Sequence, residues 1–442
     1  MVKSDVDDLI RDNGMSEFKI SDVYALQVID SRGDPTVEVV VITEGGGVGR
    51  ALTPSGASRG TYEAVELRDG DRRYNGRGVS RAVDNVNKYI APSLKGLDSR
   101  YYRHVDRRLI EIDGTSNKSR LGANAIVATS LANVKAAADT LKMPLYQFLG
   151  GFKSRLLPAP LMNVINGGLH AGNELSFQEF MIIPVGADSF SEALRIAIEV
   201  YKELKKHLKE KYGPSAINVG DEGGYAPPMK SNSEALNALV QAIRSAGYVD
   251  GLDFMLALDA AASQIYNDSS NTYTVDGISM TSEELIDYYV ELVNTYPIKI
   301  IEDPFHEEGF KEFAELRKRV ASKTLIIGDD LTVTNIERIK KALSLDAIDG
   351  CIIKINQVGT LSESEDSINL LLMSSKRAII SHRSGDTEDP VIAHIAVAYE
   401  TGLIKTGAPA RGERTSKYNE LLRIEHWLGG DAKYGGKYLG KI

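Results

Sequence analysis

The chain has 442 residues, of which 43% are apolar and 26% charged, the composition of a folded globular protein. Its 52 Lys and Arg against 61 Asp and Glu give a formal net charge of −9, which argues against a nucleic-acid scaffold because such proteins carry a basic surplus. The length exceeds one ordinary globular core and predicts two domains or a barrel with an addition.

The first 143 residues have the pattern of a small α+β domain. Three β-rich segments come first, and helical patterns follow them. The strands are predicted at residues 18–28, 36–43 and 48–53, and the helices at 79–89, 101–112 and 120–141. We therefore expect a domain over residues 1–143 with three strands followed by helices.

From residue 144 onward, short apolar strands alternate with amphipathic helical stretches. The strands are predicted at residues 254–259, 298–302, 324–329, 351–354, 378–382 and 403–405. Such strand and helix units are what a (β/α) barrel requires, although a doubly wound open sheet has a similar rhythm. No glycine-rich phosphate fingerprint follows the first of these strands, and each strand ends in an ionisable residue. This favours a barrel for residues 144–442.

Carboxylates end the first three of these strands, at Asp259, Glu302 and Asp329. In a barrel the C-terminal strand ends surround one mouth, so the three side chains should lie near one another. Oxygen ligands of this kind suit a hard cation such as Mg²⁺. A single acid at a strand end more often faces water or caps a helix, but an ordered set is harder to attribute to chance.

Basic residues end the next three strands, at Lys354, at His382 with Arg383, and at Lys405. Cations beside a metal site predict an anionic substrate or a lysine base, because nearby positive charge lowers the pKa of a lysine. Three acids followed by three bases therefore predict one catalytic mouth.

Two further glutamates lie in unusual surroundings. Glu179 sits inside the apolar run FQEFMIIPVG, and Glu222 is followed by glycines in NVGDEGGYAPP. A carboxylate embedded among apolar groups tends to be held neutral, which suits a general acid. A paired structural carboxylate is the alternative.

The same segments carry a resemblance to the enolases, which extends from about residue 18 to residue 427. The motifs include SRGDPTVEV (31–39), PSGASRGTYEAVELRDGD (54–71), NVINGGLHAGNELSFQEFM (163–181), NVGDEGGYAPP (218–228), IEDPFHEEGF (301–310), KINQVGTLSES (354–364), SHRSGDTEDP (381–390) and IKTGAPARGER (404–414). So many long motifs in one order are very specific. The resemblance implies an α/β fold in which a (β/α)8-type barrel of enolase-like ββαα(βα)6 order follows a smaller α+β domain.

The resemblance also implies an activity, which is the Mg²⁺-dependent reversible dehydration of 2-phospho-D-glycerate to phosphoenolpyruvate in glycolysis and gluconeogenesis. Lys354 would take the proton from C2, Glu222 would help expel the C3 hydroxyl, and Glu179 would assist it. Two Mg²⁺ per active site are implied. The first would be held by Asp259, Glu302 and Asp329, and the second, binding with substrate, by Ser58. The substrate-binding residues would be His170, Glu179, Glu302, Asp329, Lys354, His382, Arg383, Ser384 and Lys405.

Several positions depart from the family pattern, among them Asp34, Arg59, Gln264, Asp386 and Gly412. Every position with an implied chemical role is retained, so we expect activity. One alternative is a superfamily member acting on another carboxylate, although a substrate without phosphate would not need the SGAS and SHRS motifs. A second is a binding or structural protein on an enolase scaffold, which could lose its metal ligands without penalty.

The expected partner is the small-molecule substrate, and the resemblance suggests a homodimer or an assembly of dimers. Cys351 is the single cysteine and cannot form an internal disulfide, and the first twenty residues lack the apolar core of a secretion signal. No stretch approaches the roughly 18 apolar residues of a membrane span. We expect a cytoplasmic protein that is not integral to a membrane, and a secondary presence at the cell surface or outside the cell stays open.

Overall fold

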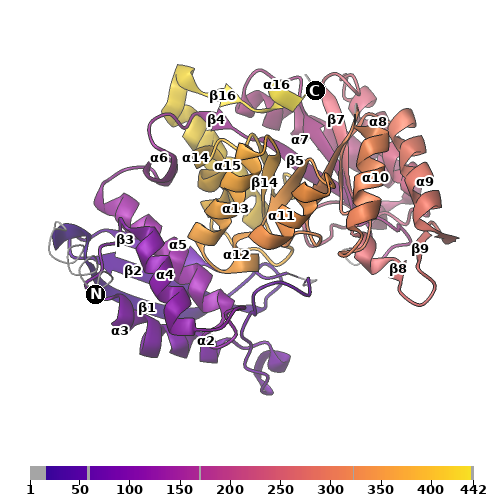
Figure 1. Ribbon diagram of the computed structural model, residues 1–442. Helices are drawn as coiled ribbons and strands as arrows, with labels where there is room; N and C mark the ends of the chain where they lie inside the picture. Colours follow the sequence, from indigo (N-terminus) through magenta and orange to yellow (C-terminus); the bar gives the residue numbers. More distant parts are fainter. Residues whose placement is uncertain (1–15, 57–59, 169–170, 322, 440–442) are drawn as a thin grey trace. The chain divides into compact units, whose positions relative to one another are not determined.

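The computed structural model describes residues 16–56, 60–168, 171–321 and 323–439 (Figure 1). The chain divides into two compact units. Unit 1 comprises residues 1–154 together with residues 354–366 and 383–398. Unit 2 comprises residues 155–353, 367–382 and 399–442.

Unit 1 contains an antiparallel three-stranded sheet of β1 (Ile20–Ile29), β2 (Pro35–Thr43) and β3 (Val48–Leu52), in that order. This confirms the predicted strands. The central strand β2 is buried along most of its length. Helix α5 (Ala123–Thr140) packs very closely on the sheet, because a Cβ on Gly49 would lie 1.9 Å from the carbonyl oxygen of Ala132. A helix rich in alanine and a glycine in β3 together permit this approach.

The helices of unit 1 agree with the predicted helical stretches, with two differences. Helix α5 begins at Ala123 rather than at residue 120, because Gly122 has a φ of +99° that a helix cannot contain. The helix expected to end at residue 89 continues through a π-helical turn, η3, to residue 94. The remaining short elements are η1 (Ser16–Phe18), η2 (Arg73–Gly76), α2 (Ser80–Asn85), η3 (Val86–Ile90), α3 (Ala91–Leu94), α4 (Tyr102–Asp113) and α6 (Leu145–Gly150).

Unit 2 is built on a closed eight-stranded barrel with the order β11-β12-β13-β14-β15-β5-β6-β7 (Figure 1). Strand β6 is antiparallel to both of its neighbours, and the other pairs are parallel. The barrel strands are β5 (Ala159–Asn166), β6 (Glu179–Pro184), β7 (Phe254–Asp259), β11 (Ile298–Glu302), β12 (Leu325–Gly328), β13 (Gly350–Ile353), β14 (Arg377–Ser381) and β15 (Leu403–Lys405). The predicted strands are therefore confirmed to within a few residues.

The elements follow one another in the predicted ββαα(βα)6 order, beginning with β5, β6, α7 and α8. The helices are α7 (Phe190–Tyr212), α8 (Asn232–Ser245), α9 (Ser282–Thr295), α10 (Phe310–Val320), α11 (Ile336–Ser344), α12 (Ile355–Val358), α13 (Leu361–Met373), α14 (Val391–Ala398), α15 (Gly412–Leu428) and α16 (Gly436–Leu439). Short additions are β4 (Leu156–Leu157), which pairs with β16 (Lys433–Tyr434), the sheet of β8 (Tyr266–Asn267), β9 (Thr272–Val275) and β10 (Ile278–Met280), and the 3-10 turns η5 (Pro214–Ile217), η6 (Ala262–Gln264) and η7 (Gly429–Asp431).

Local sequence signals explain where the outer helices begin. The hydroxyls of Ser189, Ser231 and Thr281 each accept the backbone N–H of the glutamate three residues on. At Thr281 the glutamate side chain returns the bond, which completes a capping box. Each helix thus starts at a residue that satisfies its free N–H groups.

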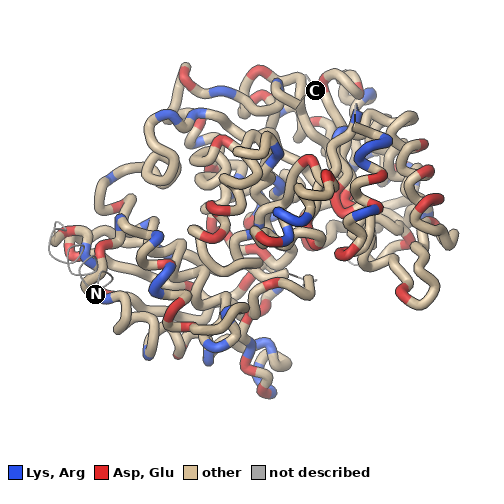
Figure 2. The backbone as a smooth tube through the Cα atoms, in the orientation of Figure 1, with Lys and Arg blue, Asp and Glu red and all other residues tan. Residues whose placement is uncertain are grey.

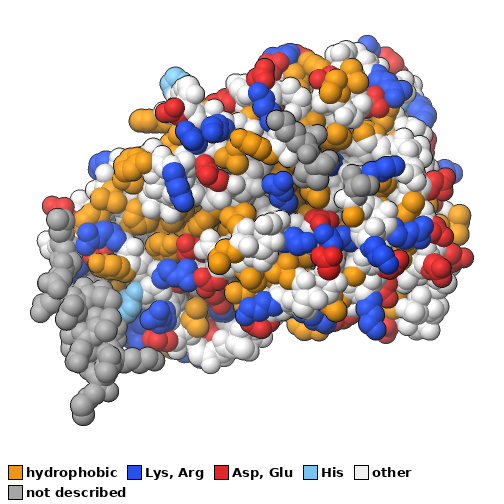
Figure 3. Space-filling model, turned by 45° about the horizontal axis from the view of Figure 1, so that its top comes forward, with side chains coloured by type: hydrophobic (Ala, Val, Ile, Leu, Met, Phe, Trp, Pro, Cys, Tyr) orange, Lys and Arg blue, Asp and Glu red, His pale blue; other side chains and the backbone are white. Residues whose placement is uncertain are grey.

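Charged residues of both signs are interspersed along the outer helices, for example on α10 (Figure 2). The face drawn in Figure 3 likewise mixes Lys and Arg with Asp and Glu. Within the described part of the chain, no helix has the length and apolar character that a membrane crossing requires.

A buried carboxyl group in unit 1 predicts a pH-dependent stability. Asp106 on α4 accepts the backbone N–H of Ser362 at 2.9 Å, and burial raises its pKa from 3.8 to about 6. Because the native state then binds more protons than the unfolded chain between pH 4 and 6, stability falls as pH rises through this window. At 1.36 kcal/mol per pKa unit the loss is about 3 kcal/mol.

Asp106→Asn cannot ionise, so we expect its free energy of unfolding not to show this decrease with rising pH. Denaturant unfolding from pH 4 to pH 7 measures it. The control is Asp84→Asn on α2, where the carboxylate is exposed. Parallel pH profiles for wild type and Asp106→Asn would contradict the prediction.

Candidate active site

Three acidic residues meet at one end of the barrel because the sheet register aligns them. Asp259 ends β7 and pairs in register with Glu302, which ends the parallel strand β11. Strand β6 runs the opposite way, so its first residue, Glu179, lies opposite Asp259. All three side chains are buried. Because β6 begins at the end of the barrel where β7 and β11 finish, the three carboxylates lie together.

The ammonium group of Lys405 lies among these carboxylates. Its Nζ is 2.8 Å from both oxygens of Glu302, 3.0 Å from Oδ2 of Asp259 and 3.2 Å from Oε1 of Glu179. Burial lowers the pKa of Lys405, but the surrounding carboxylates outweigh it, and the pKa is raised well above its usual range. Lys405 is therefore a fixed cation. The expectation that nearby positive charge lowers a lysine pKa at this mouth does not hold for Lys405, because its neighbours are negative.

Glu179 holds a proton more readily than a carboxyl group in water does. Burial and the charge of Glu222 raise its pKa well above the usual range, although Lys405 opposes the shift. This is the direction expected for a carboxylate embedded among apolar groups. The surroundings of Glu179 therefore favour its protonated form more than water would.

Asp329 directly follows β12 and lies in a second acidic cluster. One oxygen from each of Asp303, Asp329 and Asp330 lies within 4.8 Å of the others. Asp303 is buried, and its two carboxylate oxygens accept the backbone N–H groups of Asp329 and Asp330 at 2.8 and 2.7 Å. Since both of its oxygens are engaged, Asp303 serves to orient the chain here, which leaves Asp329 and Asp330 as the candidate ligands of this cluster.

Glu222 is held in a buried loop by bonds to its backbone and to its side chain. Its Oε2 accepts Nδ2 of Asn163 at 3.0 Å, and its Oε1 lies 3.6 Å from Nε2 of His382. The backbone N–H of Ala408 donates to the carbonyl of Glu222 at 2.9 Å. This approach needs Gly407, because a Cβ there would lie 2.6 Å from the same carbonyl oxygen.

Three predicted site residues belong to unit 1. Lys354 directly follows β13 in the chain and is half-buried. Arg383 and Ser384 are buried. Both terminal nitrogens of Arg383 donate to the carboxylate of Glu63, at 3.0 and 3.2 Å, and Nη1 also donates to Oδ1 of Asn356 at 3.0 Å. The carboxylate of Glu63 thus occupies a bidentate fork that equally suits a phosphate group.

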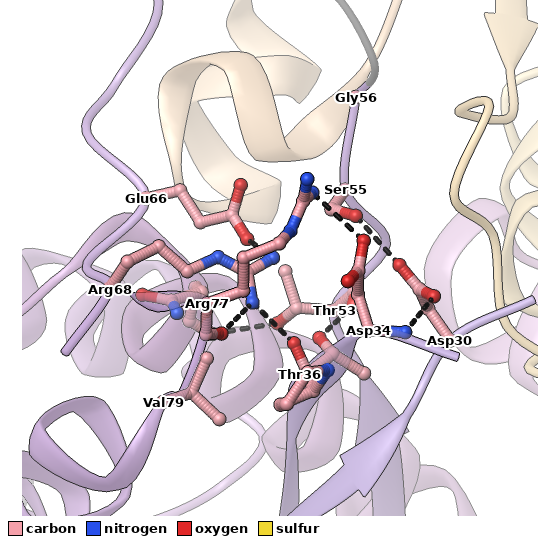
Figure 4. Close-up of polar contacts among 12 residues, drawn as sticks. Asp30, Asp34, Thr36, Thr53, Ser55, Gly56, Glu66, Arg68, Arg77 and Val79 are labelled. Carbon is pink, nitrogen blue, oxygen red and sulfur yellow. Dashed lines mark hydrogen bonds and ion pairs between the residues drawn. The ribbon is translucent and has the colours of Figure 1, made fainter. Parts of the chain in front are cut away.

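The segment that leads to the predicted loop is anchored at Ser55 (Figure 4). Its backbone exchanges two hydrogen bonds with Gly385, at 2.7 and 2.8 Å. Its hydroxyl points toward Asp30 and donates to Oδ2 at 2.9 Å. Ser58 and His170, which were predicted to bind metal and substrate, lie outside the described residues, as does the departure at Arg59.

Three supporting residues were missed by sequence reasoning. Asn163 contacts Glu222, Arg414 contacts His382 at 2.5 Å, and Gln178 donates to Oδ2 of Asp259 at 3.4 Å. A signal existed for Asn163, which is a polar residue in the wholly buried strand β5. Arg414 and Gln178 lie within the motifs IKTGAPARGER and NVINGGLHAGNELSFQEFM, but no apolar periodicity marks either of them as a residue of the mouth.

Two departures from the family pattern have visible contacts. Gln264 donates to Oε1 of Gln178 at 2.8 Å, so it orients the amide that faces Asp259. Asp34 forms an ion pair with Arg77 at 2.9 Å, drawn in Figure 4. Neither departure removes a predicted metal ligand.

Unpartnered polar atoms line the same strand ends. Among the described residues, the side-chain amide of Asn166, Oε2 of Glu179, Nε2 of His382 and Oγ1 of Thr406 are buried and have no hydrogen-bond partner. Buried polar groups are rarely left in this state, and those that are require explanation by a bound ion, water or function. Their gathering at one end of the barrel therefore indicates a site for a polar ligand.

The residues present suit a divalent cation. Asp259, Glu302 and Asp329 offer only hard oxygen atoms, which Mg²⁺ prefers. In this structure the ammonium of Lys405 is the cation on which Asp259 and Glu302 converge. The donor set therefore fits the predicted metal.

Comparison with known proteins decides the family. The family model described as "Enolase, N-terminal domain" matches residues 20–149, and that described as "Enolase, C-terminal TIM barrel domain" matches residues 154–442. This chain belongs to the enolase family. It is 56% identical to the enolase of Methanocaldococcus jannaschii over 95% of this chain and 98% of the relative. The enolases of Methanopyrus kandleri and Pyrococcus furiosus are 57% and 54% identical, over 94% and 96% of this chain and 98% and 99% of theirs.

Membership in the enolase family confirms the resemblance, the α/β barrel preceded by a three-stranded domain, and the assignment to the lyases. The family uses Mg²⁺, and the acidic strand ends suit this metal. The roles of individual residues stay predictions.

The cluster around Lys405 predicts a link between metal and stability. Lys405→Met leaves Glu179, Asp259 and Glu302 buried without their cation, and breaking a buried pair in this way costs about 3–5 kcal/mol. We expect a lower Tm in EDTA and a larger rise on adding Mg²⁺ than in wild type, measured by calorimetry. Lys340→Met, at an exposed ion pair on α11, is the matched control. An equal response to Mg²⁺ in wild type and Lys405→Met would contradict the prediction.

Proposed function

We propose that this enolase-family chain catalyses the reversible dehydration of 2-phospho-D-glycerate to phosphoenolpyruvate, in glycolysis and gluconeogenesis. One observation carries the proposal beyond family membership: the buried carboxylates of three neighbouring strands converge on one cation at the same end of the barrel as the unpartnered polar atoms. Such a mouth suits a small anion that binds through a metal.

Two Mg²⁺ per active site form part of the proposal. Asp259, Glu302 and Asp329 would hold the first, and Ser58 the second, which binds together with substrate. When bound, the metal supplies positive charge at the substrate carboxylate, where negative charge accumulates as C2 loses its proton. Lys405, whose raised pKa keeps it charged, would bind the same carboxylate group.

The remaining steps belong to side chains of this chain. Lys354 would accept the proton from C2, and the electron pair of the broken C–H bond would be held by the substrate carboxylate. In a second step that pair would form the C2–C3 double bond as the C3 hydroxyl leaves. Glu222 would deliver a proton to that hydroxyl, so that the products are phosphoenolpyruvate and water. Glu179, whose raised pKa allows it to stay protonated, would assist on the leaving-group side.

The phosphate would be bound by Arg383 and Ser384. The fork of Arg383 already holds the carboxylate of Glu63 through both terminal nitrogens, which supports its use for a planar or tetrahedral oxyanion. His170 and His382 would line the same pocket.

A domain division, a cellular location and an oligomeric state complete the proposal. We assign residues 1–143 to a domain that carries the Ser58 loop and residues 144–442 to the catalytic barrel. We further propose that the protein is cytoplasmic and forms a homodimer or an assembly of dimers. Light scattering would measure the oligomeric state.

The activity has a direct test. Purified protein with 2-phosphoglycerate and Mg²⁺ should produce the ultraviolet absorbance of the enol product. EDTA should abolish this signal, because it removes the Mg²⁺ that the acidic residues would bind. Absence of signal, with EDTA making no difference, would overturn the enzyme function and favour a binding role. Turnover of a carboxylate that lacks phosphate, in preference to 2-phosphoglycerate, would favour another superfamily activity.

The two proton transfers can be separated by isotope exchange. Lys354→Ala should abolish exchange of the C2 proton with solvent, because no base remains. Glu222→Gln should retain exchange but lose at least about 100-fold in dehydration, the usual contribution of a general acid. Both are measured by NMR in D₂O. Equal exchange in wild type and Lys354→Ala would refute the assignment of the base.

A further inference from the structure

A fully buried arginine connects two parts of the catalytic mouth. Arg414, on α15, has no exposed side-chain surface. Its Nη1 lies 2.5 Å from Nδ1 of His382, and its Nη2 donates to the carbonyl oxygen of Asp221 at 3.0 Å. The guanidinium of Arg414 thus contacts both His382 and the loop that carries Glu222.

The chemistry of this contact assigns the proton on His382. A guanidinium carries only donors and remains charged at any pH at which the protein is folded. Nδ1 must therefore accept the hydrogen bond. A neutral imidazole with an acceptor at Nδ1 carries its proton on Nε2, and both the other tautomer and the imidazolium would set N–H against N–H.

We propose that Arg414 is a positioning residue that holds His382 as the neutral Nε2–H tautomer, with this proton directed at Glu222. The inference rests on the proposed function in one respect, since the role of Glu222 as the acid at the leaving group comes from it. Arg414 acts through His382 and is not itself a catalytic residue.

The surroundings of Nε2 support this arrangement. Within the described part of the chain this nitrogen is buried and has no hydrogen-bond partner. Oε1 of Glu222 lies 3.6 Å from it, which is too far for a hydrogen bond but places a carboxylate oxygen in front of it. The other oxygen of Glu222 accepts Nδ2 of Asn163. Asn163 thus bonds one oxygen of Glu222, and the Nε2–H of His382 would face the other across 3.6 Å.

The charges around His382 also favour its neutral form. Burial lowers the pKa of His382 well below its usual range. Glu222 opposes this shift, whereas Arg414, Lys405 and Lys417 add to it. His382 therefore does not supply the proton that leaves with the hydroxyl, and it serves to orient the group that does.

The first test is spectroscopic and uses the full-length protein labelled with ¹⁵N-histidine. The resonances of His382 are assigned by their loss in His382→Asn. We expect Nδ1 to have the shift of an unprotonated nitrogen and Nε2 that of a protonated one, unchanged from pH 6 to pH 8. A protonated Nδ1 at pH 7, in either the other tautomer or the imidazolium, would overturn the proposal.

Variants separate positioning from simple packing. Arg414→Met removes the donor and should mix the tautomers of His382. It should also lower kcat about tenfold or more with KM changed less than about threefold, while exchange of the C2 proton continues. Arg414→Lys keeps a cationic donor and should restore the Nε2–H tautomer and part of kcat. Arg423→Gln, at an exposed ion pair on the same helix, is the control and should match wild type.

The outcomes distinguish this proposal from the proposed function. An Arg414→Met protein that loses kcat but keeps the Nε2–H tautomer would overturn the positioning role. If Arg414→Met does not fold, the wild-type spectrum and Arg414→Lys still decide the tautomer. Absence of enolase activity in wild type would refute the proposed function, whereas the spectrum tests the contact between Arg414 and His382 independently.

Discussion

The contact between Lys405 and the carboxylates of Glu179, Asp259 and Glu302 is the interaction on which the catalytic mouth depends. Buried carboxylates repel one another and lose their hydration, so without a cation they would be forced to bind protons or to separate. One lysine on β15 satisfies all three at once. The barrel can therefore keep a concentration of negative charge at its mouth, which is the property that a divalent cation requires.

The same cluster separates the roles of two glutamates. Glu179 is fully enclosed and takes up a proton readily, because burial and the charge of Glu222 raise its pKa. Glu222 is also buried, but its Oε2 accepts a hydrogen bond from Asn163 and its Oε1 lies 3.6 Å from Nε2 of His382. Two carboxyl groups at one mouth thus have different surroundings, which is what two distinct roles in a proton-transfer sequence require.

Behind the reacting groups lies a set of buried and half-buried side chains that hold the backbone and the orientation of their neighbours. Asp303 accepts the N–H groups of Asp329 and Asp330, and Arg414 links His382 to Asp221. Gln264 orients Gln178 toward Asp259. Groups of this kind limit the freedom of the side chains that perform the chemistry, and precision at the mouth depends on them.

The sequence by itself determined the strand and helix order, the acidic and basic strand ends, and, through its motifs, the enolase family. These features are local, because apolar periodicity and residue type are written along the chain. It did not determine which strand ends face each other, that Lys405 is surrounded by negative rather than positive charge, or that Arg414 and Gln178 support the mouth. Those facts depend on the barrel register, which sets Glu179 opposite Asp259 across an antiparallel pair. Contacts between residues far apart in the chain, such as Lys405 and Asp259 at 146 positions, arise only when the barrel closes, so the tertiary structure alone decided them.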